Sequence, residues 1–382
     1  MKKIIAMILS VLMLLSLAAC GSGTNAAGST KGTDTTKMTD ATAETQTGEA
    51  GETQTAGPES REMQADKAGT AESQTGEAST TDSAAGSDAK SAPETVTIQA
   101  LDGNGEAVDV EVPYNPQRIA ILDMAVLDML DNWDLGDRVV GMPKSSQIDY
   151  LMDYNNNEAI VNLGTLKEVD MEALMSCEPD VIFIGGRLSS QYDALSEIAP
   201  VVYLSTDYDI GLLQSVKNNS AAVASLFGME DMAAEQTAAF DARAAKLAEA
   251  ANGKTAVIGM VTSANFNTLG DGSRCSLIGG EIGFTNLAND VDSTHGNESS
   301  FELLVSLNPD YIFVLDRDSA INTEGAQLAQ EIMENELVQK TDAYKNGNIV
   351  YLTPTVWYLC EGGITATDVM LQDLEAGILG QE

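Results

Sequence analysis

A repeated segment constrains what this chain can fold into. Residues 171–187, MEALMSCEPDVIFIGGR, recur 130 positions later at 301–317 as FELLVSLNPDYIFVLDR, and the copies share Glu, Leu, Ser, Pro, Asp, Ile, Phe and Arg in register. Each copy begins with apolar residues at helical spacing, breaks at Pro-Asp and continues as an uninterrupted apolar run. The pattern predicts a helix, a turn and a buried strand, twice over. The chain is therefore expected to contain two related halves.

The end of each copy indicates where a site would lie. All-apolar strands are typical of parallel sheets covered on both faces, and such sheets bind ligands beyond the carboxyl ends of their strands. Arg187 and Arg317 lie just beyond the carboxyl ends of the two predicted strands. One copy alone would be an ordinary αβ unit. Two copies that end in the same cation predict a cleft between two lobes, with an arginine on each side.

The first twenty residues predict export from the cytoplasm. Lys2 and Lys3 precede an apolar stretch that is too short to span a bilayer comfortably, the pattern of a signal peptide. The sequence Leu-Ala-Ala-Cys that ends at Cys20 resembles the lipobox of bacterial lipoproteins. The resemblance implies that residues 1–19 are removed and that the Cys20 sulfur carries a lipid. The alternative is a plain secretory signal whose cysteine is incidental.

Residues 20–94 predict a disordered tether. They are Thr, Ser, Ala, Gly and Glu with almost no large apolar side chains, so they cannot bury a core. A flexible chain of this length has a reach of roughly 45–55 Å. The net charge of -38 argues against nucleic acid as a partner and against adhesion to anionic lipid. We therefore expect the lipid to be the membrane anchor.

The remaining chain predicts an α/β fold. Residues 95–114 alternate apolar and polar side chains around DGNG, which indicates a hairpin, and strands then alternate with helices. Residues 229–251 contain neither Gly nor Pro and predict one long helix, which should allow little opening and closing. The expected parts are an N-terminal lobe at 95–228, a linking helix at 229–252 and a C-terminal lobe at 253–382.

The cysteines do not describe a disulfide framework. After Cys20 they are Cys177, Cys275 and Cys360, an odd number without CxxC spacing. Cys177 lies in the repeated helix and is expected in the core. A pairing of Cys275 with Cys360 stays open.

These features together resemble the substrate-binding lipoproteins of ABC importers, in the helical-backbone class that serves siderophores, haem and cobalamin. The resemblance covers about residues 95–380. The segments most similar to catecholate siderophore binders of the enterobactin and petrobactin type are PQRIAILD, GDRVVGMPKS, IGGRLSSQYDALSEIAP, GDGSRCSLIGGEIGF, NPDYIFVLDRD and NGNIVYLTPTVWYL.

The resemblance implies a fold and a function. The fold would be two Rossmann-like αβ lobes joined by a single long helix, the helical-backbone periplasmic-binding-protein fold. The protein would be a monomer without enzymatic activity or an intrinsic cofactor, anchored at the extracytoplasmic face of the cell membrane. It would capture ferric iron as a siderophore chelate in the cleft between the lobes and deliver it to an ABC permease dimer.

The resemblance also implies a ligand-binding set. In that family three arginines face the anionic iron complex, and the matching positions here are Arg187, Arg274 and Arg317. Guanidinium groups keep their charge and form directed hydrogen bonds, which suits a ferric tris-catecholate of about three negative charges. The other arginines of the folded part are expected in surface ion pairs; they are Arg118, Arg138 and Arg243.

Two further positions match iron ligands of some catecholate binders. His295 lies in an HG step and Tyr358 in VWYL. Ferric iron accepts phenolate and imidazole, so both would ligate a four-oxygen chelate and neither would ligate a six-oxygen one. The alternative for His295 is a solvated loop residue.

Glu172 and Glu302 are the repeat-related acids. Each is expected in the first turn of its helix, near the carboxyl edge of the following strand. In the family the corresponding glutamates contact arginines of the permease. The structural alternative is a favourable interaction with the helix dipole.

Other classes of function remain open at this point. Haem or cobalamin would fit the same fold, although three arginines favour a more anionic ligand. A hydrolase lacks support, because the chain has one histidine and neither GxSxG nor HExxH. A zinc or manganese binder should offer several histidines or carboxylates in the cleft. In a structural or adhesive lipoprotein the arginines would be scattered in space.

Overall fold

The computed structural model describes residues 93–289, 296–298 and 301–380. The predicted signal peptide, Cys20 and the tether as far as residue 92 lie outside the described residues. Residues 93–228 are called the first half below, and residues 253–380 are called the second half. None of the helices in the described part of the chain has the length and apolar composition that crossing a bilayer requires.

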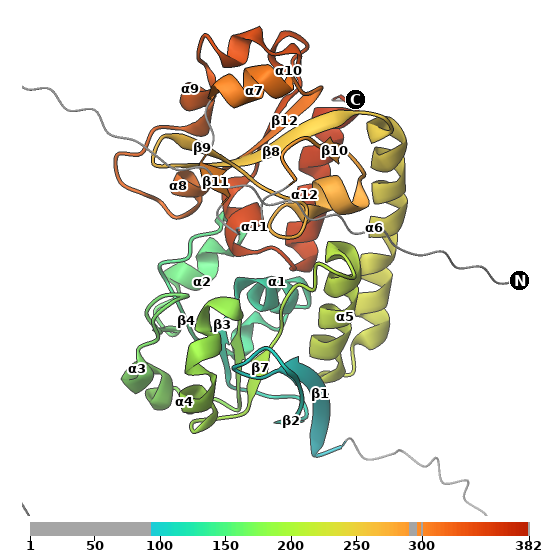
Figure 1. Cartoon of the computed structure of the whole chain (residues 1–382). Coiled ribbons are helices and arrows are strands. Elements are labelled where there is room, and N and C mark those ends of the chain that lie inside the picture. The colour runs from blue at the N-terminus through green and yellow to red at the C-terminus, as the bar shows by residue number, and fades with distance from the viewer. Residues whose placement is uncertain (1–92, 290–295, 299–300, 381–382) are drawn as a thin grey trace, which may run out of the picture. The chain divides into compact units, whose positions relative to one another are not determined.

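The first half forms the lower part of Figure 1. Its sheet has the strand order β2-β1-β7-β6-β3-β4-β5. The strands β3 to β7 are parallel, and β1 and β2 form the predicted antiparallel hairpin. The bounds are β1 (Thr95–Leu101), β2 (Ala107–Pro113), β3 (Ile119–Leu122), β4 (Val139–Met142), β5 (Val161–Asn162), β6 (Val181–Ile184) and β7 (Val201–Tyr203).

The second half is built on a sheet in the order β11-β9-β8-β12-β13, and β10 also pairs with β8. The strands β8, β12 and β13 are parallel. The bounds are β8 (Thr255–Thr262), β9 (Asn265–Thr268), β10 (Thr285–Asn286), β11 (Asn297–Glu298), β12 (Tyr311–Asp316) and β13 (Ile349–Leu352).

Helices cover these sheets, and the two repeat copies fold as predicted. Helix α3 precedes β6 and helix α7 precedes β12. The bounds are α1 (Met124–Asn132), α2 (Met152–Asn156), α3 (Met171–Ser176), α4 (Tyr192–Ser196), α5 (Leu212–Ser225), α6 (Glu230–Ala251), α7 (Phe301–Leu307), α8 (Arg317–Ala320), α9 (Ala329–Met333), α10 (Asp342–Lys345), α11 (Pro354–Leu359) and α12 (Ile364–Ile378).

The aspartate of each Pro-Asp step explains part of the repeat. Asp180 Oδ2 accepts hydrogen bonds from the main-chain N–H groups of Gln117 and Arg118, at 2.7 and 2.9 Å, just before β3. Asp310 Oδ2 accepts from the N–H and hydroxyl of Thr255, at 2.9 and 3.0 Å, where β8 begins. Strands β3 and β8 are the neighbours of β6 and β12 in their sheets. Each aspartate therefore ties its own strand to the start of the adjacent one.

The core accounts for the uninterrupted apolar runs. Every residue of β3 and β6 is buried, because separate clusters of apolar side chains pack on the two faces of the first sheet. The second sheet is likewise covered on both faces. One cluster is shared by the halves and contains Phe183 of β6, Phe313 of β12 and Leu247 of α6. This continuous apolar contact opposes separation of the halves.

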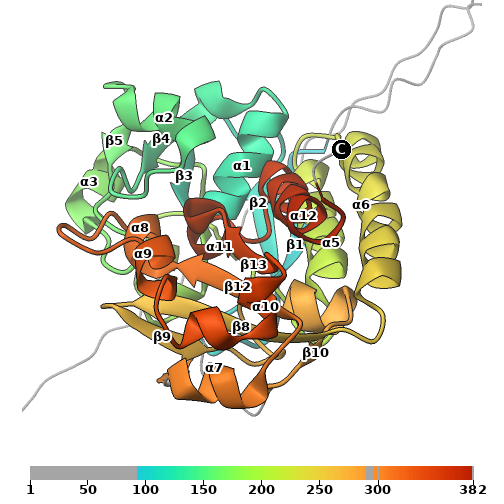
Figure 2. The same ribbon diagram turned by 90° about the horizontal axis from the view of Figure 1, so that it is seen from above.

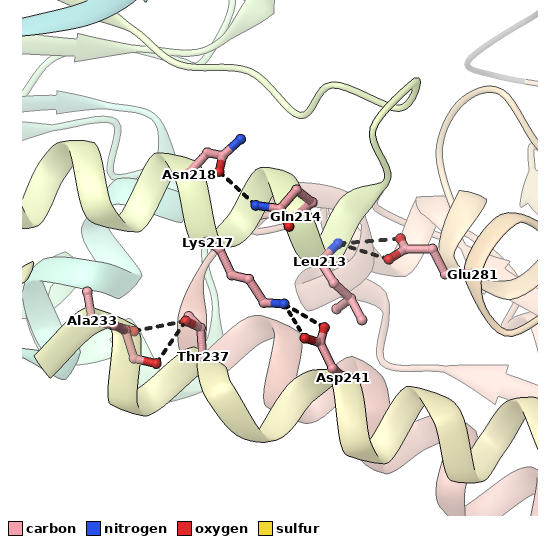
Figure 3. Close-up of polar contacts among 9 residues, drawn as sticks. Leu213, Gln214, Lys217, Asn218, Ala233, Thr237, Asp241 and Glu281 are labelled. Atoms are coloured by element: carbon pink, nitrogen blue, oxygen red, sulfur yellow. Dashed lines mark hydrogen bonds and ion pairs between the residues drawn. The ribbon is translucent and has the colours of Figure 1, made fainter. Parts of the chain in front are cut away.

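Helix α6 links the two halves as predicted. It has 22 residues, so it is about 33 Å long. Figures 1 and 2 show α12 between α1 and α6. Lys217 of α5 forms an ion pair with Asp241 of α6 at 2.5 Å (Figure 3), and Arg243 of α6 bonds Asp368 and Glu375 of α12. The α/β fold class is confirmed, whereas the exact lobe boundaries stay predictions.

The three cysteines of the described residues are free and buried. Cys177 is 2% exposed and belongs to the core, as expected. A disulfide between Cys275 and Cys360 is not formed. The Cys360 thiol instead lies 3.3 Å from the carbonyl oxygen of Met124.

Candidate functional site

A cavity of about 380 Å³ lies where segments of both halves meet. In the first half it is lined by residues that follow the carboxyl ends of β3, β6 and β7, the edge at which parallel sheets bind ligands. The first half contributes Asp123, Gly185, Gly186, Arg187, Leu204, Ser205, Thr206 and Tyr208, and the second half contributes Arg274, Tyr358, Leu359 and Glu361.

The basic side chains distinguish this cavity from two other hollows in the described part of the chain. A hollow of about 440 Å³ beside β1, β7 and α5 is lined by neutral side chains and Asp207. A second of about 400 Å³ is lined by four aspartates, with Gly136, Tyr154 and Asn157. An anionic ligand would be repelled by the second and would find no cation in the first.

The three predicted arginines come from different elements but meet at one side chain. Arg187 follows β6 and Arg317 follows β12, whereas Arg274 lies between β9 and the helical turn at Leu277–Glu281. Their guanidinium carbons are 5.5, 5.7 and 4.4 Å from the centre of the Tyr358 ring, respectively. The negative face of an aromatic ring attracts cations, so Tyr358 favours this clustering. The scattered arrangement expected of a structural lipoprotein is not found.

Hydrogen bonds hold the arginines against helix α11. Arg187 Nη2 donates to the carbonyl oxygen of Tyr358 at 3.2 Å. Arg274 Nη1 donates to the carbonyl oxygens of Trp357 and Tyr358 at 3.0 and 3.1 Å. Arg317 Nε donates to the Tyr358 hydroxyl at 3.1 Å. The acceptors for Arg187 and Arg274 are neutral carbonyl groups, so these bonds leave the positive charge uncancelled.

Ion pairing differs among the arginines. Within the described residues, Arg187 and Arg274 have no carboxylate at ion-pair distance, while Arg317 Nη1 lies 3.3 Å from Asp318 Oδ1. Of the arginines expected in surface ion pairs, Arg243 forms them. That expectation is wrong for the other two among the described residues, because Arg118 donates to main-chain carbonyl groups and Arg138 donates to the Asn115 side-chain oxygen and the Pro116 carbonyl group. The cavity thus keeps positive charge in a chain that is strongly negative overall.

The electrostatic surroundings favour the phenolate form of Tyr358. Tyr358 is only 4% exposed, and burial by itself would raise its pKa. The hydrogen bond from Arg317, together with the charges of Arg317, Arg274 and Arg187, outweighs burial and lowers the pKa of Tyr358 below its ordinary value.

Two carboxyl groups also line the cavity, and the sequence reasoning missed both. Burial raises the pKa of Asp123 and of Glu361, although nearby arginine charge opposes the shift. Glu361 Oε2 accepts a hydrogen bond from the Tyr208 hydroxyl at 3.0 Å. Asp123 directly follows the apolar strand β3, so the strand-end rule that indicated Arg187 could have found it. Glu361 and Tyr208 lie in irregular segments without such a pattern.

The remaining predicted residues are His295, Glu172 and Glu302. His295 lies outside the described residues, so its relation to Tyr358 stays a prediction. Glu172 and Glu302 lie in the first turns of α3 and α7, as expected, and both are exposed. Exposure leaves both able to contact another protein.

The lowered pKa of Tyr358 has a measurable consequence. On raising the pH, Tyr358 should ionise before the seven tyrosines whose pKa is raised by their surroundings, which are Tyr150, Tyr154, Tyr203, Tyr208, Tyr311, Tyr344 and Tyr351. Absorbance at 295 nm should therefore show one early tyrosinate, and Arg317→Met should shift that step to higher pH. An unchanged titration in Arg317→Met would contradict the assignment, and Arg138→Met is the matched control.

Comparison with known proteins agrees with the fold. A family model described as periplasmic binding protein matches residues 119–356. Petrobactin-binding protein YclQ of Bacillus subtilis is 34% identical over 300 residues, which cover 78% of this chain and 92% of YclQ. Ferric-anguibactin-binding protein FatB of Vibrio anguillarum is 27% identical over 273 residues, covering 70% of this chain and 84% of FatB.

Solved structures give the same result. The crystal structure of YclQ matches with a TM-score of 0.70 and 30% identity, covering 76% of this chain and all of that one. The periplasmic catecholate-siderophore binding protein VctP from Vibrio cholerae matches with a TM-score of 0.68 and 31% identity, covering 74% of this chain and all of VctP. Each of these relatives is named as a binding protein. The chain therefore belongs to the periplasmic binding protein family.

Proposed function

We propose that this protein captures a ferric catecholate-type siderophore in the cavity and delivers it to an ABC permease. The observation that carries the proposal is the convergence of Arg187, Arg274 and Arg317 on Tyr358. A ferric tris-catecholate brings about three negative charges and a shell of oxygen acceptors, which directed guanidinium groups match. The names of YclQ and VctP, a petrobactin binder and a catecholate-siderophore binder, support this ligand class.

The character of the cavity favours this ligand over haem or cobalamin. Its lining is rich in charged and hydroxyl side chains, among them Asp123, Ser205, Thr206 and Glu361. A haem site would need a broad apolar surface for the macrocycle. The iron is cargo that arrives within the chelate, and the protein itself supplies charge and hydrogen-bond donors.

Removal of one arginine should weaken binding. Replacement of Arg187, Arg274 or Arg317 by Ala should cost about 1.5–3 kcal/mol of binding free energy, the range for a charge-assisted hydrogen bond. Quenching of Trp357 fluorescence by a ferric tris-catecholate measures it, since Trp357 adjoins Tyr358 and Trp133→Phe removes the other tryptophan. Arg138→Ala is the control outside the cavity. Unaltered affinity in the variants of all three arginines that meet at Tyr358 would refute the assignment.

Direct iron ligation by Tyr358 and His295 belongs to the same proposal. The arginines around Tyr358 favour the phenolate, which is the form that binds ferric iron. A four-oxygen ferric complex should show a shifted charge-transfer band on binding, and the double variant Tyr358→Phe with His295→Ala should lose the shift. The spectrum of a six-oxygen complex serves as the control, because its iron has no free site. An unchanged spectrum in the double variant would show that neither residue is a ligand.

Delivery to a permease is proposed through Glu172 and Glu302. Both are exposed, in the first turns of helices that repeat one another in sequence and structure. Replacement of both by Lys should abolish iron-siderophore uptake by cells while ligand affinity stays at the wild-type value. Replacement of Glu178, an exposed acid outside the pair, is the matched control. Normal uptake by the double variant would leave only the helix-dipole role.

We infer further that the mature protein is a monomer held at the extracytoplasmic membrane face by lipid on Cys20. The support is the basic start, the short apolar stretch and the Leu-Ala-Ala-Cys sequence. Cys20→Ser should release the protein from the membrane fraction into the detergent-free supernatant. Retention of Cys20→Ser in the membrane would contradict the anchor.

A further inference from the structure

Two helices beside the cavity begin without a capping side chain of their own. Helix α5 follows Gly211 and helix α12 follows Gly363, and neither glycine can accept a hydrogen bond through a side chain. The first N–H groups of a helix have no partner inside the helix, so some other acceptor must serve them. In both helices the acceptor is a carboxylate from the opposite half.

Asp128 of the first half caps helix α12 of the second half. It lies on α1 and is fully buried. Its two carboxylate oxygens accept hydrogen bonds from the main-chain N–H groups of Thr365 and Ala366, each at 2.9 Å. A Cβ atom on Gly363 would lie 2.5 Å from Asp128 Cγ, so glycine is needed there to admit the carboxylate.

Glu281 of the second half caps helix α5 of the first half. Its Oε1 accepts a hydrogen bond from Leu212 N at 2.6 Å, and its Oε2 lies 3.3 Å from Leu213 N (Figure 3). A Cβ atom on Gly211 would lie 3.0 Å from Glu281 Cδ, and Gly211 has a φ of 91° that disfavours other residues. In both caps a carboxylate of one half accepts hydrogen bonds from the start of a helix in the other half. Asp128 caps from the first half to the second, and Glu281 caps from the second half to the first.

Each cap joins two segments that line the cavity. Helix α1 begins after Asp123, and α12 begins shortly after Tyr358 and Glu361, so the Asp128 cap ties these segments together. Helix α5 begins shortly after Tyr208, and Glu281 follows Arg274 by seven residues, so the second cap ties those segments. The cross-half hydrogen bond from Tyr208 to Glu361 links the two pairs.

We propose that Asp128 and Glu281 are positioning residues for ligand recognition. By capping a helix of the opposite half, they set the spacing between the two walls of the cavity and hence the size of ferric chelate that it selects. The bonds join protein groups alone, so they hold the walls independently of contacts to the ligand and reduce the ordering that binding requires. This inference rests on the proposed function, because it concerns the ligand of the same cavity.

The test compares two ferric complexes on the full-length protein. Dissociation constants for a six-oxygen tris-catecholate and a four-oxygen bis-catecholate are measured by tryptophan quenching well below the melting temperature. Glu281→Ala should change the ratio of the two dissociation constants by about fivefold or more. This fold-change corresponds to the free energy that a helix loses with its cap. Glu281→Gln keeps an acceptor oxygen and should restore the ratio.

A matched control separates positioning from stability. Asp170 caps α3 within the first half by accepting from Ala173 N at 3.0 Å, far along the chain from any cavity residue of the second half. Asp170→Ala should lower the melting temperature and leave the ratio unchanged. In Glu281→Ala, amide hydrogen exchange should rise on both sides of the cap, in residues 204–213 and 274–282.

The possible results are distinct. An unaltered ratio in Glu281→Ala, with both complexes still bound, would overturn the inference and leave the proposed function standing. An altered ratio of dissociation constants in Asp170→Ala would also overturn the inference. It would show that the loss of a helix cap changes the ratio even when the cap does not join the two halves. Wild-type protein that binds neither complex would overturn the proposed function, and the inference with it.

Discussion

The cavity depends on the contact of three guanidinium groups with one phenol ring. Like charges at such short range repel each other, and the chain offers 58 acidic residues that could separate them. Tyr358 offsets the repulsion among the arginines, because its ring face and its hydroxyl attract the guanidinium groups. The carbonyl groups at the end of α11 add partial negative charge. Arg187 and Arg274 are held in place by carbonyl groups and not by carboxylates, whereas Arg317 also pairs with Asp318, so the cluster keeps positive charge that can attract a multiply charged anion.

The repeat explains how two of these arginines come to meet at Tyr358. Asp180 and Asp310 tie β6 and β12 to their neighbouring strands, so each strand ends at a defined place. Arg187 and Arg317 follow those ends and therefore point to the same side of their sheets. Arg274 and Tyr358 come from segments without a counterpart in the other half. The repeated segments thus supply one arginine from each half, and segments without a repeat supply the other residues of the cluster.

The two halves are held together by more than the linking helix. A continuous apolar cluster runs through both, and helices α5 and α12 are each capped from the opposite half. Buried contacts of these kinds are lost together when the halves separate, so wide opening is costly. These contacts therefore oppose a large change in the distance between the two walls of the cavity.

The sequence by itself determined the α/β class, the repeated helix and strand, the long helix and the positions of Arg187 and Arg317. These follow from local periodicity and from the rule that parallel strands end at one edge, both of which are properties of short segments. The family resemblance added Arg274 and Tyr358. Only the tertiary structure decided that Tyr358 is the side chain on which the arginines meet. It also decided that Asp123, Glu361 and Tyr208 share the cavity, and that Asp128 and Glu281 cap helices far away in sequence. Such contacts join residues that are distant along the chain, and their partners are chosen by packing, which local pattern does not encode.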